Sequence, residues 1–227
     1  MKYLFTLLLL LLLASSATGQ QPAYKNPDLN IEERVEDLLQ RMTLREKFWQ
    51  CFMIPGDFSQ GKERYREGIF GLNGSRANQL NAAEQMLESS PGETALHTAE
   101  RINSLQHFFL EETRLSIPII PFDEALHGLV RKGATAFPQA IGLAATWDTE
   151  LMQKVAAAIA REVKSRGIRQ VLSPVVNISR DPRWGRTEET YGEDPFLTTH
   201  MAVAFITEFE KRGVITTPKH FIANVGD

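Results

Sequence analysis

The chain has 227 residues, a formal net charge of −3, 43% hydrophobic residues and a single cysteine. Positive and negative side chains are interspersed, which excludes the basic surface typical of nucleic-acid-binding proteins and the polybasic segments that bind membrane surfaces. No intrachain disulfide can form, and the apolar neighbours of Cys51 predict a buried thiol. The composition therefore favours a neutral small molecule as the binding partner.

The first nineteen residues have the features of a secretory signal peptide. Lys2 supplies a positive charge, a leucine-rich apolar segment follows at 4–14, and residues 17–19 (ATG) have the small side chains that signal peptidase recognises. This segment is short for a membrane span, and no later segment approaches the roughly 20 apolar residues that a span needs. We expect residues 1–19 to be removed and residues 20–227 to form one exported, soluble domain, periplasmic or extracellular.

Helical and extended patterns alternate along the remaining chain. The predicted helices cover 31–39, a short segment opened by a capping box at 43–46, 77–87, 94–112, 148–166 and 194–212. The predicted strands cover 52–54, 68–72, 117–122, 168–176 and 214–218. Asp148 and Asp194 are expected N-caps, and Gly167 and Gly213 are expected to end their helices.

Strands that alternate with helices predict a parallel sheet with helices outside, either open and doubly wound or closed as a (β/α)8 barrel. Polar residues follow the ends of three different strands, at Glu124, at 179–194 and at Lys219-His220. This distribution favours the barrel, whose sites collect loops from several strands, and the chain has no GxGxxG phosphate loop. About five of the eight βα units are present, so we expect an incomplete TIM-barrel-like domain that is truncated at its carboxyl end.

The segment 171–195 joins an apolar strand to a loop crowded with charges around Trp184 and Tyr191. The charged residues are Arg180, Asp181, Arg183, Arg186, Glu188, Glu189, Glu193 and Asp194. Guanidinium and carboxylate groups beside aromatic rings suit a polyhydroxylated ligand. A salt-bridged surface loop has the same composition, and packing the loop is the more common role of two such aromatic residues.

Three separated motifs resemble the amino-terminal barrel domain of glycoside hydrolase family 3, which contains β-glucosidases and β-xylosidases. They are residues 122–128 (FDEALHG), 177–195 (NISRDPRWGRTEETYGEDP) and 218–221 (PKHF). The resemblance implies exo-acting hydrolysis of β-linked sugars with retention, without a cofactor. It also implies that the nonreducing-end sugar of an oligosaccharide or β-glycoside is bound by Glu124, Arg186, Lys219 and His220, with the adjacent Asp123 as a competing carboxylate. Glu189 is expected to orient an arginine.

Retaining hydrolysis uses two carboxyl groups about 5 to 5.5 Å apart, one as nucleophile and one as acid/base. The resemblance implies that the nucleophile lies on a later strand and the acid/base in a following domain, both beyond Asp227. The catalytic residues are therefore unassigned in this chain, and Asp123, Asp181 and Asp227 are not expected to take these roles. Glu124 stands where glucosidases of the family usually have aspartate, which favours a β-xylosidase.

Two other functions compete with this interpretation. A non-catalytic exported sugar-binding protein would use the same arginines and aromatic residues and would need no nucleophile. A metal-dependent barrel hydrolase could use His127, His220 and nearby carboxylates. The histidines lack a metal-binding spacing such as HExxH, so no metal site is predicted.

Overall fold

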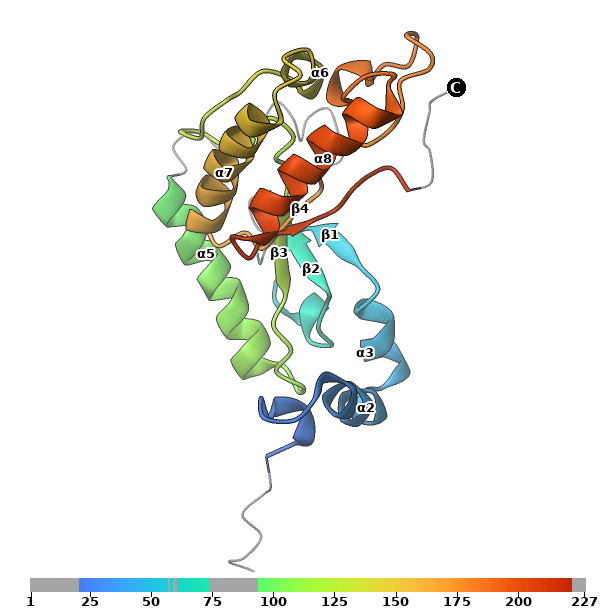
Figure 1. Cartoon of the computed structure of the whole chain (residues 1–227). Helices are drawn as coiled ribbons and strands as arrows, with labels where there is room; N and C mark the ends of the chain where they lie inside the picture. The colour runs from blue at the N-terminus through green and yellow to red at the C-terminus, as the bar shows by residue number, and fades with distance from the viewer. Residues whose placement is uncertain (1–20, 57, 59–60, 74–93, 222–227) are drawn as a thin grey trace, which may run out of the picture. The chain divides into compact units, whose positions relative to one another are not determined.

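The computed structural model describes residues 21–56, 58, 61–73 and 94–221 (Figure 1). The predicted signal segment and the predicted helix 77–87 lie outside the described residues. The chain divides into two compact units, Met1–Lys47 and Phe48–Asp227, and all the predicted site residues belong to the second.

The first unit consists of a 3-10 turn, η1 (Ala23–Lys25), the helix α2 (Ile31–Arg41) and the start of α3 (Leu44–Trp49). The side chain of Asn30 caps α2 by accepting a hydrogen bond of 2.8 Å from the Glu33 amide. The capping box is confirmed, since the Glu46 carboxylate accepts from the Thr43 amide at 2.8 Å and the Thr43 hydroxyl accepts from the Glu46 amide at 3.1 Å.

The second unit is built on a five-stranded, wholly parallel sheet in the order β1-β2-β3-β4-β5. Its strands are β1 (Met53–Pro55), β2 (Gly71–Asn73), β3 (Ile120–Asp123), β4 (Gln170–Val171) and β5 (Ile215–Thr216). Neighbours in the sheet are neighbours in the sequence, as in a (β/α)8 barrel. The five strands are those of an incomplete TIM-barrel-like domain, which confirms the predicted fold class.

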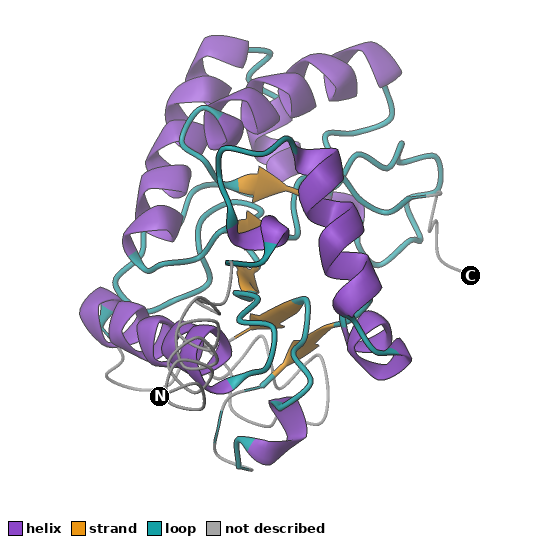
Figure 2. Cartoon of the chain, turned by 90° about the horizontal axis from the view of Figure 1, so that it is seen from below, coloured by secondary structure: helices purple, strands orange, loops and turns teal. Residues whose placement is uncertain are grey.

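Helices lie on the outside of the strands (Figures 1 and 2). They are α5 (Ala95–His107), continued by a π-helical turn η3 (Phe108–Glu112), then α6 (Ala140–Ala144), α7 (Thr149–Ser165) and α8 (Pro195–Glu210), with 3-10 turns at η2 (Glu63–Tyr65) and η4 (Thr187–Glu189). Asp148 and Asp194 cap α7 and α8 as predicted. Gly167 and Gly213 follow these helices with φ of 83° and 70°, values that favour glycine.

Two apolar clusters hold the strands to the helices. The larger one packs α7 and α8 against β4 and includes the buried residues Ile159, Val171, Phe205 and Phe209. The smaller one packs β2 and β3 against α5 and includes Leu72, Leu105, Phe108, Phe109 and Ile119. The parallel pairing of β3, β4 and β5 places their carboxyl ends at one edge of the sheet.

The predicted strand 168–176 is wrong in its second half. Regular pairing stops at Val171, and Pro174, which has no N–H, interrupts the ladder. Pairing resumes in an isolated parallel bridge between Val175 and Lys219, where the Val176 amide donates to the Lys219 carbonyl at 2.7 Å. This bridge places Lys219 beside the start of the charged loop.

Cys51 is exposed, which corrects the predicted buried thiol. It lies in the turn between α3 and β1, where Phe48 is also exposed, so the apolar segment around Cys51 is not enclosed.

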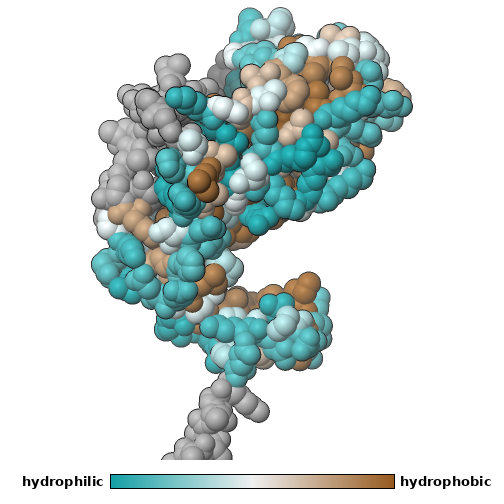
Figure 3. All heavy atoms as spheres, turned by 90° about the vertical axis from the view of Figure 1, so that its left-hand side faces the viewer, coloured by the Kyte–Doolittle hydropathy of each residue, from teal (hydrophilic) through white to brown (hydrophobic). Residues whose placement is uncertain are grey.

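Apolar atoms also reach the surface elsewhere, as Figure 3 shows for one face. Within the described segments, none of the helices combines the length and apolar character required to cross a membrane.

Candidate sugar-binding site

The candidate site gathers at the carboxyl ends of three neighbouring strands. Glu124 follows β3 directly, Arg186 lies in the loop after β4, and Lys219 and His220, joined by a cis peptide bond, follow β5. Because parallel strands end at the same edge of a sheet, these residues come together although they are far apart in the sequence. Sequence reasoning predicted all four.

Glu124 and Lys219 form an ion pair at this edge. The Lys219 Nζ lies 3.1 Å from each of the two carboxylate oxygens of Glu124. The side chains are 15% and 29% exposed for Lys219 and Glu124, so the pair is partly shielded and still accessible. Burial raises the pKa of Glu124, and the Lys219 ammonium opposes this shift. The pair presents both a hydrogen-bond acceptor and a donor to a ligand.

Arg186 is held by Glu189 in a two-pronged ion pair. Its Nε and a terminal nitrogen each donate to a different Glu189 oxygen at 2.7 Å, and the turn η4 brings the two residues within reach. The bond to Glu189 raises the pKa of Arg186, and Glu124 contributes to that shift through its charge. The predicted pairing of Glu189 with an arginine is therefore confirmed, and it fixes the guanidinium plane near Glu124.

The same loop carries a second pair of the surface type. A terminal nitrogen of Arg183 lies 2.6 Å from the Asp181 Oδ2, but the side chains of Arg183 and Asp181 are 89% and 44% exposed. Such an exposed ion pair adds little to the free energy of unfolding and is not part of an enclosed binding site. The two interpretations of the charged loop thus apply to different residues: Arg186 and Glu189 face the site, whereas Arg183 and Asp181 form a surface salt bridge.

Asn177 fixes the imidazole of His220. Its Oδ1 accepts a hydrogen bond of 3.0 Å from the His220 amide and lies 3.0 Å from Nδ1, so Nδ1 carries a proton and donates to the same oxygen. Burial lowers the pKa of His220, as do the charges of Arg186 and Lys219. A neutral ring in this tautomer has an acceptor at Nε2. The Trp184 ring stands edge-on to it, with centroids 6.4 Å apart.

Asp123 and Glu124 are adjacent but have different surroundings. The Asp123 side chain is 0% exposed and its Oδ2 lies 2.6 Å from a terminal nitrogen of Arg131, which is 5% exposed. Its Oδ1 accepts a hydrogen bond of 2.8 Å from the Glu124 amide. Glu124 therefore points to Lys219 at the accessible edge, and Asp123 points into the protein.

Other aromatic and histidine residues of the motifs are structural. Tyr191 is buried in the larger apolar cluster, and this burial raises its pKa. The Nδ1 of His127 lies 2.9 Å from the Phe137 carbonyl, which ties the two ends of a loop together. Among the residues that the structure describes, no group of three histidines, cysteines or carboxylates is placed to hold a metal ion.

Sequence reasoning missed three polar residues around the site. Arg131 and Asn177 were not singled out, although each lies within or just after a recognised motif, and Asn73 is buried where β2 ends. A polar residue at the carboxyl end of an apolar strand is the signal that could have found Asn73 and Asn177. Nothing in the local sequence around Arg131 indicates its partner.

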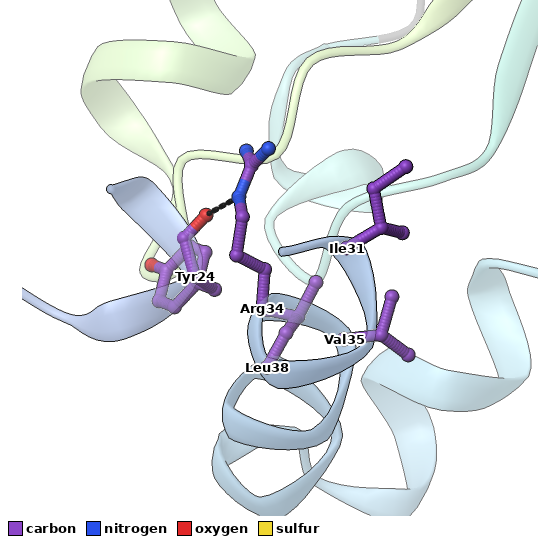
Figure 4. A pocket seen from close by; sticks show the side chains of 5 residues that line it. All are labelled: Tyr24, Ile31, Arg34, Val35 and Leu38. Atoms are coloured by element: carbon purple, nitrogen blue, oxygen red, sulfur yellow. Dashed lines mark hydrogen bonds between the residues drawn. The ribbon is translucent and has the colours of Figure 1, made fainter. Parts of the chain in front are cut away.

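A groove in the first unit is lined by Tyr24, Ile31, Arg34, Val35 and Leu38 (Figure 4). Its one charged side chain, Arg34, donates from Nε to the Tyr24 carbonyl at 3.1 Å. The groove is otherwise mainly apolar and contains none of the predicted site residues, so its chemistry does not suit a sugar.

Comparisons with known proteins agree with these motifs. A family model described as the glycosyl hydrolase family 3 N terminal domain matches residues 82–227. A probable beta-glucosidase C of Aspergillus oryzae is 34% identical, with 91% of this chain and 34% of that protein covered. A putative beta-xylosidase of Formosa agariphila is 33% identical, with 81% of this chain and 24% of that protein covered.

Among solved structures, a β-glucosidase from Erythrobacter marinus has a TM-score of 0.73 and 29% identity, with 88% of this chain and 27% of that one covered. The chain thus spans about a third or less of the length of these proteins. The family match covers more than half of the chain, and the chain therefore belongs to glycosyl hydrolase family 3, of which it carries N-terminal-domain sequence.

Proposed function

We propose that this chain binds the nonreducing-end sugar in an exo-acting, retaining β-glycosidase of carbohydrate catabolism. The observation that carries the proposal is the ion pair of 3.1 Å between Glu124 and Lys219, with Arg186 and His220 at the same sheet edge. This arrangement of charged donors and an acceptor is open to a ligand and belongs to a family whose related proteins are named as β-glucosidases and β-xylosidases.

Each side chain has a distinct role in this proposal. Glu124 accepts a hydrogen bond from a sugar hydroxyl, while Lys219 and Arg186 donate to hydroxyl oxygens. His220 accepts at Nε2, because Asn177 holds its Nδ1 proton. Hydrogen bonds to charged groups are roughly twice as strong as neutral ones, so a few of them hold a neutral sugar firmly. Asp123 is left out as a ligand because it is buried and ion-paired.

The bond-breaking groups come from elsewhere in the protein in this proposal. Since the chain spans about a third of its relatives, we propose that sequence beyond Asp227 supplies the nucleophile and the acid/base. They would stand about 5 to 5.5 Å apart on either side of the glycosidic bond, as retention requires. The residues described here would fix the sugar between them.

The proposed substrate is a β-xyloside in preference to a β-glucoside. Glutamate is one methylene longer than aspartate, so the Glu124 carboxylate would extend to where a hexose carries its C5 hydroxymethyl group. A pentose lacks that group and leaves the space to Glu124. No cofactor is required for this reaction.

The proposed location is outside the cytoplasm. The leucine-rich segment and small residues at 17–19 support export with cleavage near Gly19-Gln20, leaving a domain that starts at residue 20. Mass spectrometry of the exported protein tests this, and a mature form that retains Met1 would contradict it.

The deciding experiment measures turnover of aryl β-xylosides by the full-length protein, with Lys219→Ala as the variant. The proposal predicts hydrolysis by the wild type and a large loss of kcat/KM in the variant. Xylose binding without any turnover would instead support the non-catalytic sugar-binding protein.

A further inference from the structure

The carboxyl end of β3 carries two consecutive carboxylates, of which only one faces the candidate site. We propose that Arg131 and Asp123 form a buried positioning pair that holds the backbone of Glu124 and thereby sets where its carboxylate meets the sugar. The inference rests on the proposed function for its meaning, but its geometry can be tested without it.

The first step is the contact between Asp123 and Glu124. The Asp123 Oδ1 accepts the Glu124 amide proton at 2.8 Å, so the side chain of one residue fixes the peptide of the next. This bond satisfies the Glu124 amide immediately after β3 ends at Asp123. The Glu124 backbone, and with it the origin of its side chain, is therefore defined by the orientation of the Asp123 carboxylate.

The second step is the contact that orients Asp123. The Asp123 Oδ2 lies 2.6 Å from a terminal nitrogen of Arg131, and both side chains are almost fully buried. A charge-assisted bond of this length in a shielded place has little freedom to rotate. Both carboxylate oxygens are occupied, so Asp123 acts through Glu124 and not on a ligand.

The third step is what holds Arg131. One terminal nitrogen donates to the Val130 carbonyl at 2.8 Å, and the other lies 3.5 Å from the Asn73 Oδ1 at the end of β2. The loop that carries Arg131 is closed by two contacts between His127 and Phe137. The His127 Nδ1 lies 2.9 Å from the Phe137 carbonyl, and the Phe137 amide donates to the His127 carbonyl at 2.8 Å. The guanidinium thus contacts its own loop at 2.8 Å and, more weakly, the end of the neighbouring strand at 3.5 Å.

These contacts form one chain of polar groups across the sheet edge. It runs from Asn73 through Arg131 and Asp123 to the Glu124 backbone, and from the Glu124 carboxylate to Lys219. Residues that support a binding group in this way must hold it to within about half an ångström. Arg131 is accordingly a positioning residue, and a purely structural role is the competing account.

The test is a double-mutant cycle in the full-length protein between Arg131→Met and Glu124→Ala, with kcat/KM for an aryl β-xyloside as readout. If Arg131 acts through Glu124, Arg131→Met alone lowers kcat/KM by roughly 10-fold or more. In the Glu124→Ala background the same substitution then lowers it by less than about threefold, because its target is gone. Equal losses in both backgrounds would overturn the proposal.

Arg131→Met leaves the buried Asp123 carboxylate without its partner and could prevent folding. The double substitution Asp123→Asn/Arg131→Met removes both charges and leaves neither unpaired. The cycle with Glu124→Ala is therefore repeated with this double substitution in place of Arg131→Met. Arg212→Met is the matched control, since it removes an arginine paired with Glu208 on α8. The control is expected to lower the melting temperature without changing kcat/KM.

Hydrogen exchange at the Glu124 amide decides the geometric claim whether or not the protein turns over substrate. The proposal predicts that exchange becomes at least about tenfold faster in the double substitution than in the wild type, beyond any change in the Arg212→Met control. Unchanged exchange would overturn it. Absence of turnover by the wild type together with faster exchange would contradict the proposed function and leave the positioning pair standing.

Discussion

The Lys219 ammonium lies 3.1 Å from both carboxylate oxygens of Glu124, although 95 positions separate the two residues in the sequence. The contact joins the end of β3 to the end of β5 across β4. It leaves the pair accessible while the neighbouring Asp123 is fully buried. The contrast between these two carboxylates underlies the predictions on specificity and pH.

The first prediction concerns sugar preference in the full-length protein. Glu124→Asp shortens the side chain by one methylene and makes room for the hydroxymethyl group of a hexose. We expect the ratio of kcat/KM for β-glucoside over β-xyloside to rise roughly 10- to 200-fold, as one methylene in a packed pocket allows. Asp123→Asn keeps the acceptor for the Glu124 amide and is expected to change the ratio much less. The opposite result for the two substitutions would assign specificity to Asp123.

The second prediction concerns the bidentate ion pair between Arg186 and Glu189. Arg186→Lys cannot make both bonds to Glu189, so we expect kcat/KM to fall roughly 10- to 150-fold, which is the equivalent of about 1.5 to 3 kcal/mol for a hydrogen bond to a charged group. Arg183→Lys is the matched control in the same loop, because its pair with Asp181 is exposed. Equal losses in both variants would indicate a general effect on the loop.

The third prediction concerns pH. Burial raises the pKa of Glu124, so this carboxyl takes up a proton at a higher pH than an ordinary glutamate. It is ionised above that pKa, and we expect affinity for xylose to weaken as the pH falls through it. Titration calorimetry across this range checks the expectation. Glu124→Gln is uncharged at every pH and is expected to lack this dependence, so an identical pH profile in the variant would assign the titration to another group.

Local sequence predicted the helices better than the strands. The caps at Asp148 and Asp194 and the glycine after α7 depend on neighbouring residues, and all three are confirmed. The strand at 168–176 was too long because a proline inside an apolar run interrupts the ladder without changing the apolar pattern.

The four proposed sugar-binding residues were found through motifs, and only the family resemblance favoured Glu124 over the adjacent Asp123 as the sugar ligand. Adjacent residues at a strand end point to opposite sides, and a shift of one residue exchanges them. Only the position of Arg131 in space determines that Asp123 is the buried one. Such a contact has no signal in a local pattern of residues.

The fourth prediction concerns residues 20–227 expressed alone. In the described sheet β1 and β5 are the edge strands, and unpaired edges promote aggregation. We expect the isolated segment to be poorly soluble by size-exclusion chromatography and to hydrolyse no aryl β-glycoside. Turnover that survives purification and disappears with Arg186→Ala would show that the catalytic pair lies within these residues.

A crystal structure of the full-length protein with xylose bound would test the proposed sugar site directly. We expect the sugar at the carboxyl ends of β3, β4 and β5, with Glu124, Arg186, Lys219 and His220 each within hydrogen-bonding distance of it. Asp123 is expected to remain paired with Arg131 and out of contact with the sugar. A sugar bound by Asp123, or bound away from this edge of the sheet, would show that these four residues do not form the sugar site.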